Sequence, residues 1–298
     1  ALGAVAGEGA AQLEPRLRSL VARGLLSLDT DPRSPERGQY GFVQALIREV
    51  AYGTLARRDR LTRHLAAARY FEALGDEELS GALATHYHAA YEAAAGGPEA
   101  GALAGQARIA LRAAGARARS LGSTEQAMAF LESAARLPGE ASEQVALLET
   151  AAEIALDASR YARAEAYATE IVERATAAGD RATAARLTAT MIEAVFQQDS
   201  QRGLDEGARA GTADADLGAG DIGYLRILMQ RARIAVRLGH NREGAEITER
   251  IMPGVERTRD ENLILTGLVT RGASLSGIGR PVEGLVMLDG AMRRAEAL

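Results

Sequence analysis

A helical hairpin recurs along this chain with a nearly fixed period, and this recurrence limits the folds open to it. Its clearest copy is RIALRAAGARARSLGSTEQAMAFLESAAR at 108–136, which predicts two antiparallel helices joined at Gly122. Small and apolar residues alternate at spacings of three and four, so each predicted helix carries one continuous apolar stripe. Gly115 and Ala127 are small where two helices of a hairpin must approach closely, and Gly122 suits a turn that needs a positive φ.

The turn of this hairpin can be followed through the rest of the chain. After Gly122, equivalent turns fall at Ser159, Asp199, Gly239 and Gly279, at separations of 37, 40, 40 and 40 residues. The repeat around Asp199 is the poorest match. A fixed period of this size predicts a helical solenoid, because each hairpin buries its apolar face only by stacking on its neighbours. The spacing resembles the tetratricopeptide (TPR) repeat, which implies an all-α right-handed superhelix of helical hairpins.

The composition supports helices and excludes several kinds of chemistry. Alanine makes up about a fifth of the 298 residues, aromatic residues only 4%, and tryptophan is absent, which suits closely packed helices. Cysteine is absent, so the chain has neither a disulfide framework nor thiolate chemistry. All 35 basic residues are arginine, and the net charge of −5 with both signs interspersed indicates a solvated surface, not a nucleic-acid or membrane binder.

A different pattern precedes the repeats. Residues 11–28 predict a helix that stops at Gly24 and continues into an extended LLSL, and Tyr40-Gly41-Phe42 is extended again after a polar stretch. Helix, strand, loop and strand form the second half of a winged helix. A long helix follows, which we expect to break near Gly53. We therefore predict a partial winged-helix segment at 1–45, connecting helices at 46–100 and TPR-like helical repeats at 101–298.

The junction between these segments carries a more specific pattern. It reads L-x-x-L-x-x-x-G-L-L, then Y-x-F-x-x-A-L-I-R-E-V-A-Y-x-x-L, with R-x-x-R-H-L-A-A-A shortly after. Over residues 11–140 it resembles the junction of winged helix and helical repeats in STAND-type signalling ATPases. In actinobacteria these are fused to class III adenylate cyclase domains or to LuxR- and SARP-type DNA-binding domains. Gln44 departs from the family, which commonly has histidine there. The matching residues are Leu17, Leu20, Gly24, Leu25, Leu26, Tyr40, Phe42, Ala45, Leu46, Ile47, Arg48, Glu49, Val50, Ala51, Tyr52, Leu55, Arg60, Arg63, His64 and Ala67.

This resemblance implies a non-catalytic protein–protein interaction or sensor arm of a multidomain cytoplasmic ATPase that regulates signalling or transcription. A protein partner, or the parent chain's own ATPase or output domain, would dock on the concave face and shift the arm, provided that it prefers one state. Two alternatives stay open. One is a DNA-binding regulator fragment that contacts DNA through Arg16, Arg18 and Arg23 of the winged helix. The other is a small-molecule receptor with a pocket inside the superhelix.

The concave face supplies the candidate partner-binding residues. In TPR proteins this face is lined mainly by the first helices of the hairpins, so the polar residues predicted there are the candidates. Acidic residues at helical spacing, namely Glu143, Glu149 and Glu153, are interpreted instead as a solvated face. The candidates are Arg112, Arg119, Gln144, Arg186, Arg226, Arg233 and Arg237.

No motif predicts catalysis, a cofactor or a metal. Gly218–Gly223 matches G-x-G-x-x-G, but the polar stretch before it is not the strand that a dinucleotide site requires, so we interpret it as an inter-repeat linker. A Walker A loop requires lysine, which the chain lacks. On a helix, His86 and His88 point about 200° apart and cannot bind one metal. We expect one of these rings to pack between helices and the other to be solvated.

The two ends of the sequence bear on location and completeness. No apolar run approaches the length of about 18 residues that a membrane span needs. The first residues have no initiator methionine and no charged segment of the kind that opens a signal peptide. The final helix leaves Leu285, Met287, Leu288 and Met292 without a polar capping helix after them. We therefore expect a cytoplasmic chain that is part of a longer protein.

Overall fold

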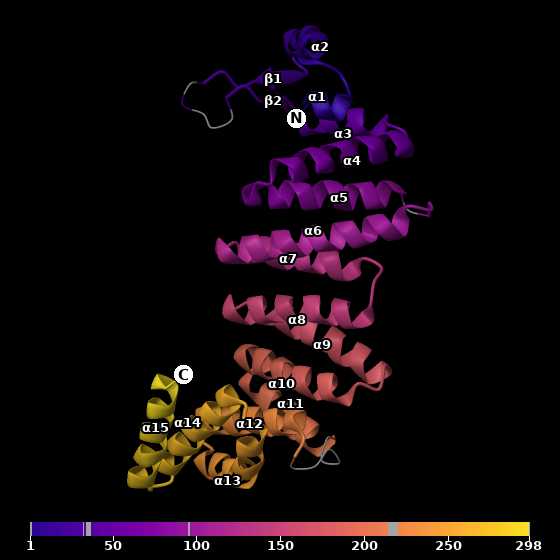
Figure 1. Ribbon diagram of the computed structural model, residues 1–298. Coiled ribbons are helices and arrows are strands. Elements are labelled where there is room, and N and C mark those ends of the chain that lie inside the picture. Colours follow the sequence, from indigo (N-terminus) through magenta and orange to yellow (C-terminus); the bar gives the residue numbers. More distant parts are fainter. Residues whose placement is uncertain (1, 32, 34–36, 95, 214–219, 298) are drawn as a thin grey trace. The chain divides into compact units, whose positions relative to one another are not determined.

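Apolar stripes and tight turns fold this chain into successive helical hairpins (Figure 1). The computed structural model describes residues 2–31, 33, 37–94, 96–213 and 220–297. In these residues the chain is an all-α, solenoid-like fold, with one small strand pair near its start. Its contacts divide it into two units, Ala1–Gln144 and Val145–Leu298, and each is described by itself.

The first unit begins with short elements. A helix, α1 (Leu2–Ala6), is followed by α2 (Ala10–Ala22), β1 (Leu26–Leu28) and β2 (Tyr40–Phe42). The strands pair antiparallel, with Leu26 opposite Phe42. Helix, strand and strand come in the predicted order, and residues 32 and 34–36 of the polar stretch between the strands lie outside the described part. The helix break predicted near Gly53 is confirmed, because α3 (Ala45–Gly53) ends there.

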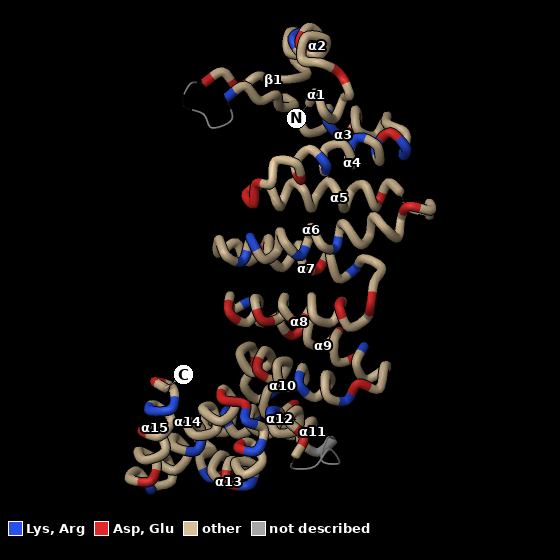
Figure 2. The backbone as a smooth tube through the Cα atoms, viewed as in Figure 1, with Lys and Arg blue, Asp and Glu red and all other residues tan. Residues whose placement is uncertain are grey.

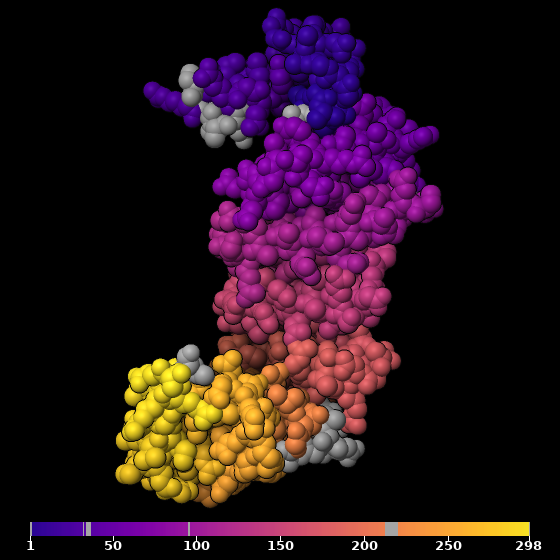
Figure 3. Space-filling view, viewed as in Figure 1, coloured from indigo at the N-terminus to yellow at the C-terminus, as the bar shows by residue number. Residues whose placement is uncertain are grey.

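Alanine allows the following helices of this unit to pack closely. Ala68, Ala84 and Ala90 are fully buried, and in the space-filling view side chains fill the spaces between the ribbons (Figure 3). A Cβ added at Gly115 would lie 3.1 Å from the side chain of Leu131, which confirms that this position needs a small residue. The helices are α4 (Arg57–Leu74), the single-turn η1 (Glu77–Leu79), α5 (Ser80–Ala94), α6 (Ala100–Ser120) and α7 (Thr124–Arg136).

The second unit is a run of hairpins with one apolar cluster between α10, α11 and α12 and another between α12, α13 and α14. In the latter cluster, Leu225, Leu228 and Met229 of α12 pack with Ile251 and Val255 of α13. In Figure 2, acidic and basic residues are interspersed along the helices around these clusters. The helices are α8 (Ala141–Asp157), which crosses the unit boundary, α9 (Tyr161–Ala177), α10 (Arg181–Gln198), α11 (Ser200–Ala213), α12 (Ile222–Arg237), α13 (Asn241–Thr258), α14 (Glu261–Gly277) and α15 (Pro281–Glu296).

The predicted turns are confirmed, although one is built differently. Gly122, Ser159, Gly239 and Gly279 have φ of 73°, 57°, 82° and 84°, the left-handed conformation that reverses the chain. Asp199 instead has a φ of −146° and is the only residue between α10 and α11. The poor match of this repeat therefore reflects a tighter connection, not a missing hairpin.

Aspartates start the first helices of three hairpins in the second unit. The carboxylates of Asp180, Asp221 and Asp260 accept hydrogen bonds from backbone N–H groups at the starts of α10, α12 and α14, over 3.1, 3.0 and 3.1 Å. Each bond satisfies a donor that a helix start leaves unpaired. Asp221 belongs to the G-x-G-x-x-G match, so the end of that match opens a helix and is not linker. Gly218 and Ala219 lie outside the described residues.

None of the helices in the described part of the chain is long and apolar enough to cross a membrane.

Candidate functional site

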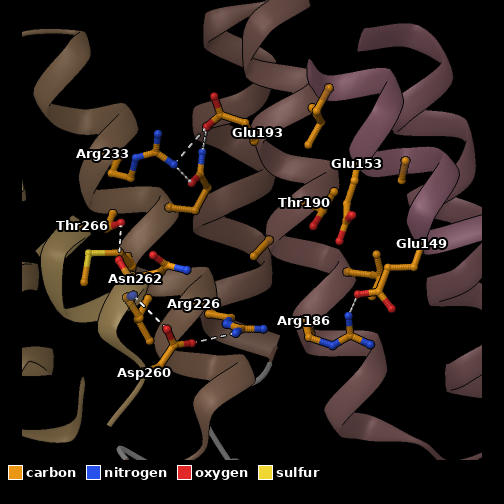
Figure 4. Close-up of a pocket in the computed structure, with 17 residues that line it drawn as sticks. Glu149, Glu153, Arg186, Thr190, Glu193, Arg226, Arg233, Asp260, Asn262 and Thr266 are labelled. Atoms are coloured by element: carbon orange, nitrogen blue, oxygen red, sulfur yellow. Dashed lines mark hydrogen bonds and ion pairs between the residues drawn. The ribbon is translucent and has the colours of Figure 1, made fainter. Parts of the chain in front are cut away.

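The first helices α8, α10, α12 and α14 line one groove of about 460 Å³ in the second unit, called here the charged groove (Figure 4). Its apolar lining residues are Ala152, Leu156, Leu187, Ala189, Met229 and Leu263. Its polar lining residues are Glu149, Glu153, Arg186, Thr190, Glu193, Arg226, Gln230, Arg233, Asp260, Asn262 and Thr266. The groove therefore combines an apolar floor with walls that carry both signs of charge.

Two ion pairs in this groove each join one hairpin to the next. Glu149 of α8 pairs with Arg186 of α10, and an Nη of Arg226 on α12 lies 2.8 Å from an Oδ of Asp260. Asp260 uses its other carboxylate oxygen to cap α14. Burial raises the pKa of Asp260, but the bonds from Arg226 and from the backbone of α14 outweigh burial and lower it, so the carboxylate is ionised at neutral pH.

A larger polar cluster surrounds Glu193 on α10. Its carboxylate lies 3.0 Å from Arg237 and 3.6 Å from Arg233, and it accepts hydrogen bonds from Gln197 and Gln230. Burial raises the pKa of Glu193, but the bond from Gln197 and the two guanidinium charges outweigh burial and lower it. One half-buried carboxylate thus orients four side chains from two hairpins.

Arg186 and Arg226 lie close enough to influence each other. Burial lowers the pKa of Arg186, and the positive charge of Arg226 lowers it further. In Figure 4, Thr190 lies between the Glu193 cluster and the Glu149–Arg186 pair. The groove therefore offers fixed donors, fixed acceptors and a half-buried hydroxyl along one continuous surface.

The structure brings together one part of the predicted binding set. Arg186, Arg226 and Arg233 line the charged groove, and Arg237 lies beside it on Glu193. The other three predicted residues lie in the first unit and do not line the groove. Arg112 and Arg119 are exposed on α6, while Gln144 of α8 donates to the carbonyl of Leu137 over 2.9 Å.

The interpretation of the acidic residues as a solvated face is wrong for two of the three. Glu143 lies 2.8 Å from Arg108, and Glu149 pairs with Arg186. Glu193, Gln230 and Asp260 also line the groove, although no sequence motif pointed to them. For the two ion pairs a signal was present in the repeat itself, because Glu149 and Arg186 are 37 residues apart and Arg226 and Asp260 are 34 apart, both near one repeat length.

The histidines differ from the expectation in part. His86 of α5 packs against α4, where its ring is stacked on Phe71, whereas His88 is half-buried and only partly solvated. Over the described ranges, no group of three or more histidine, aspartate and glutamate side chains is arranged to hold a metal ion.

Comparison with known proteins adds only a likeness of fold. No family model matches the chain, and no curated protein matches it. Among solved structures it is similar to BtubC (BKLC) from P. vanneervenii, with 12% identity and a TM-score of 0.49 over 82% of this chain and 92% of that one. It is also similar to PH0952 from Pyrococcus horikoshii, described as a Signal Transduction ATPase with Numerous Domains (STAND) protein with a tetratricopeptide repeat sensor. That match has 14% identity and a TM-score of 0.42, over 94% of this chain and 47% of PH0952.

Proposed function

We propose that this chain is a non-catalytic protein-binding arm whose charged groove holds an extended segment of a partner polypeptide. The observation that supports this function best is the continuity of the groove over the first helices of four hairpins. A peptide in such a groove presents N–H donors and C=O acceptors at regular intervals. The groove can pair both kinds, because arginine, glutamine and asparagine donate while glutamate and aspartate accept.

The electrostatics of the groove favour a peptide over a buried small molecule. Small-molecule sites are lined mainly by apolar side chains that enclose most of the ligand, whereas the walls of this groove are polar and charged. The ion pairs also hold the long side chains of Arg226 and Arg233 in place before binding. Ordering these side chains would therefore cost less binding free energy than it would on a surface of free arginines.

The proposal extends to the parent protein through the junction pattern at 11–140. The arm would belong to a cytoplasmic STAND-type ATPase of actinobacterial kind, with the partial winged helix at 1–45, connecting helices at 46–100 and repeats at 101–298. Its output would be an adenylate cyclase or a LuxR- or SARP-type domain. Binding in the groove would change the output only if the partner prefers one state of the parent protein. A nucleotide-binding loop elsewhere in the natural protein would support this assignment, and its absence would contradict it.

The DNA-binding alternative receives less support from the helix that would carry it. Arg16 of α2 donates to Glu8 over 2.8 Å, and Arg18 forms an ion pair with Glu14. Two of the three arginines that were to contact phosphates therefore already have carboxylate partners, which lowers the positive potential of this helix.

The experiment that tests the groove is a peptide selection followed by a blocking variant. Peptides of about ten residues would be selected on the 1–298 chain, and their affinities measured by fluorescence polarisation. Thr190→Trp fills the groove without removing any of its ion pairs. We expect this variant to bind the selected peptides at least about tenfold more weakly, which corresponds to a loss of roughly 1.4 kcal/mol of binding free energy.

The matched control is Thr176→Trp, which places the same ring on the exposed surface of α9. It should leave the affinities unchanged. Selected peptides that bind Thr190→Trp as tightly as the unaltered chain would show that the groove is not the binding surface.

A further inference from the structure

A second cavity, with different chemistry, lies in the first unit. It has a volume of about 360 Å³ and is formed by α1, α3, α4 and α5, together with Leu55 between α3 and α4. We call it the aromatic pocket. Its walls are formed largely by rings, namely Tyr52, His64, Tyr70, Phe71 and His86.

The rings of the pocket are arranged face to face and edge to face. Phe71 and His86 are stacked, with centroids 5.6 Å apart and planes at 11°. His64 lies 5.3 Å from His86, and Tyr52 meets the edge of His64 at 5.8 Å. Planar aromatic molecules pack favourably in offset or edge-on contact with such rings. The shape of the walls therefore fits a ring-bearing ligand.

Four polar atoms of these rings form hydrogen bonds within the wall. The hydroxyl of Tyr52 lies 2.9 Å from Nε2 of His64, and Nδ1 of His64 lies 3.0 Å from Nδ1 of His86. This second bond requires one imidazole to donate and the other to accept, so the two rings cannot both be protonated. Burial lowers the pKa of both histidines, which keeps the ring wall uncharged at neutral pH.

Two arginines form the only charged side of the pocket in the described residues. Arg60 donates to the carbonyls of Leu55 and Gly53 over 3.0 and 3.1 Å, and its guanidinium lies over the ring of Tyr52 at 4.7 Å. Arg63 is exposed, and among the described residues no hydrogen bond or ion pair reaches its side chain. Neither arginine forms an ion pair with a carboxylate in this part of the structure, and the nearest acidic influence is the charge of Glu92 on His64.

From these two features we infer that the aromatic pocket binds a small aromatic anion, whose ring body lies against Phe71 and His86 and whose carboxylate, sulfonate or phosphate is held by Arg63. A guanidinium pairs with such groups through two parallel N–H bonds. The volume of about 360 Å³ lies within the range of small-molecule sites. This site would give the arm a small-molecule input separate from the peptide groove.

A pair of fluorescent probes that differ only in charge tests this inference. The anion is 1-anilinonaphthalene-8-sulfonate, and its neutral counterpart is N-phenyl-1-naphthylamine, which lacks the sulfonate. Both would be titrated into the 1–298 chain and into Arg63→Gln at neutral pH. We expect the anion to bind saturably, and to bind about tenfold more weakly to Arg63→Gln, the effect of one charge-assisted contact. The neutral probe should bind both proteins equally.

Two controls keep the outcome interpretable. Arg58→Gln removes an exposed arginine from the same helix that does not line the pocket, and it should leave both probes unaffected. Circular dichroism of each variant must match that of the unaltered chain, because the anilinonaphthalene probe also binds partly unfolded proteins.

Three results would overturn the inference. The first is that the anion does not bind saturably. The second is that Arg63→Gln and Arg58→Gln weaken the binding of the anion equally. The third is that Arg63→Gln weakens the binding of both probes equally.

Discussion

The charged groove and the aromatic pocket both lie between packed helices, but the arginines that line them have different partners. In the groove, Arg186 and Arg226 each pair with a carboxylate from an adjacent hairpin. In the pocket, Arg60 donates to backbone carbonyls, and no described partner reaches Arg63. A groove whose charges are already paired can accept a ligand with both donors and acceptors, whereas the pocket needs a ligand that brings a negative charge. The scaffold sets the position of a cavity, and the pairing of its charges sets the chemistry of its ligand.

The largest difference in stability between the two cavities should come from large-to-small substitutions in their walls. Met229 forms part of the groove floor and is only 2% exposed, inside the main apolar cluster of its unit, whereas Phe71 of the pocket is half-buried. Met229→Ala should lower the free energy of unfolding by about 2–5 kcal/mol, because it leaves a cavity in packed surroundings. Phe71→Ala should cost less. Urea denaturation followed by circular dichroism measures both, and equal costs would contradict this difference between the two floors.

Removing a carboxylate from the groove should have the next largest effect. Glu193→Ala leaves the guanidinium groups of Arg233 and Arg237 without their acid partner, so we expect a loss of about 1–3 kcal/mol in the free energy of unfolding. Glu206→Ala is the matched control, because the Glu206–Arg209 pair lies at the surface, and it should cost less than about 1 kcal/mol. If the two variants are equally stable, the Glu193 cluster does not stabilise the groove.

Mild acid should affect the pocket and not the groove. The pKa values of His64 and His86 are lowered in the folded chain, so the unfolded chain binds more protons as the pH falls through about 6.5, the ordinary value for histidine. The folded state around them therefore loses stability from about pH 6.5 downward. No histidine is among the residues that line the groove. Hydrogen exchange, with rates corrected for pH, should show α4 and α5 losing protection between pH 7.5 and 5.5 while α10 and α12 keep theirs. A uniform response would contradict the assignment.

The smallest expected change in stability comes from replacing an arginine that has no ion pair in the described part of the chain, and it is compared with the replacement of an arginine that has one. Arg63→Gln should change the free energy of unfolding by no more than about 0.5 kcal/mol, as is usual for exposed residues without specific contacts. Arg226→Gln should cost more, because it leaves the partly buried Asp260 without its ion pair. The two variants would be compared by thermal unfolding under identical conditions. A clear loss in Arg63→Gln would reveal a structural role that the described contacts do not show.

Most of the hairpin fold could be predicted because it depends on local rules. The turns at Gly122, Gly239 and Gly279 are set by glycine at a positive φ, and the apolar stripes have the period of a helix. The connection at Asp199 could be placed but not characterised. Its tightness depends on Gly203, where an added Cβ would lie 2.6 Å from Cα of Phe196, a tertiary contact that periodicity does not reveal.

The site could be predicted only in part, for the same reason. Repeat position placed Arg186, Arg226 and Arg233 on first helices, and these three line the groove. Their acid partners depend on how far each hairpin is rotated against the next, which sequence spacing alone does not fix. The aromatic pocket was not predicted at all. Its walls come from helices outside the repeats. His64, for example, comes from α4 and His86 from α5.

The aspartates at the starts of α10, α12 and α14 have an evolutionary consequence. Asp180, Asp221 and Asp260 follow one another at 41 and 39 residues, so each of these hairpins carries its own start signal. Arg186 and Arg226 lie six and five residues after Asp180 and Asp221, and are 40 residues apart. Duplication or deletion of one such stretch in the gene would therefore add or remove a complete hairpin. The neighbouring hairpins would keep their own capping aspartates. The length of the binding surface can change in whole steps, and the range of partners with it, without the redesign of a core.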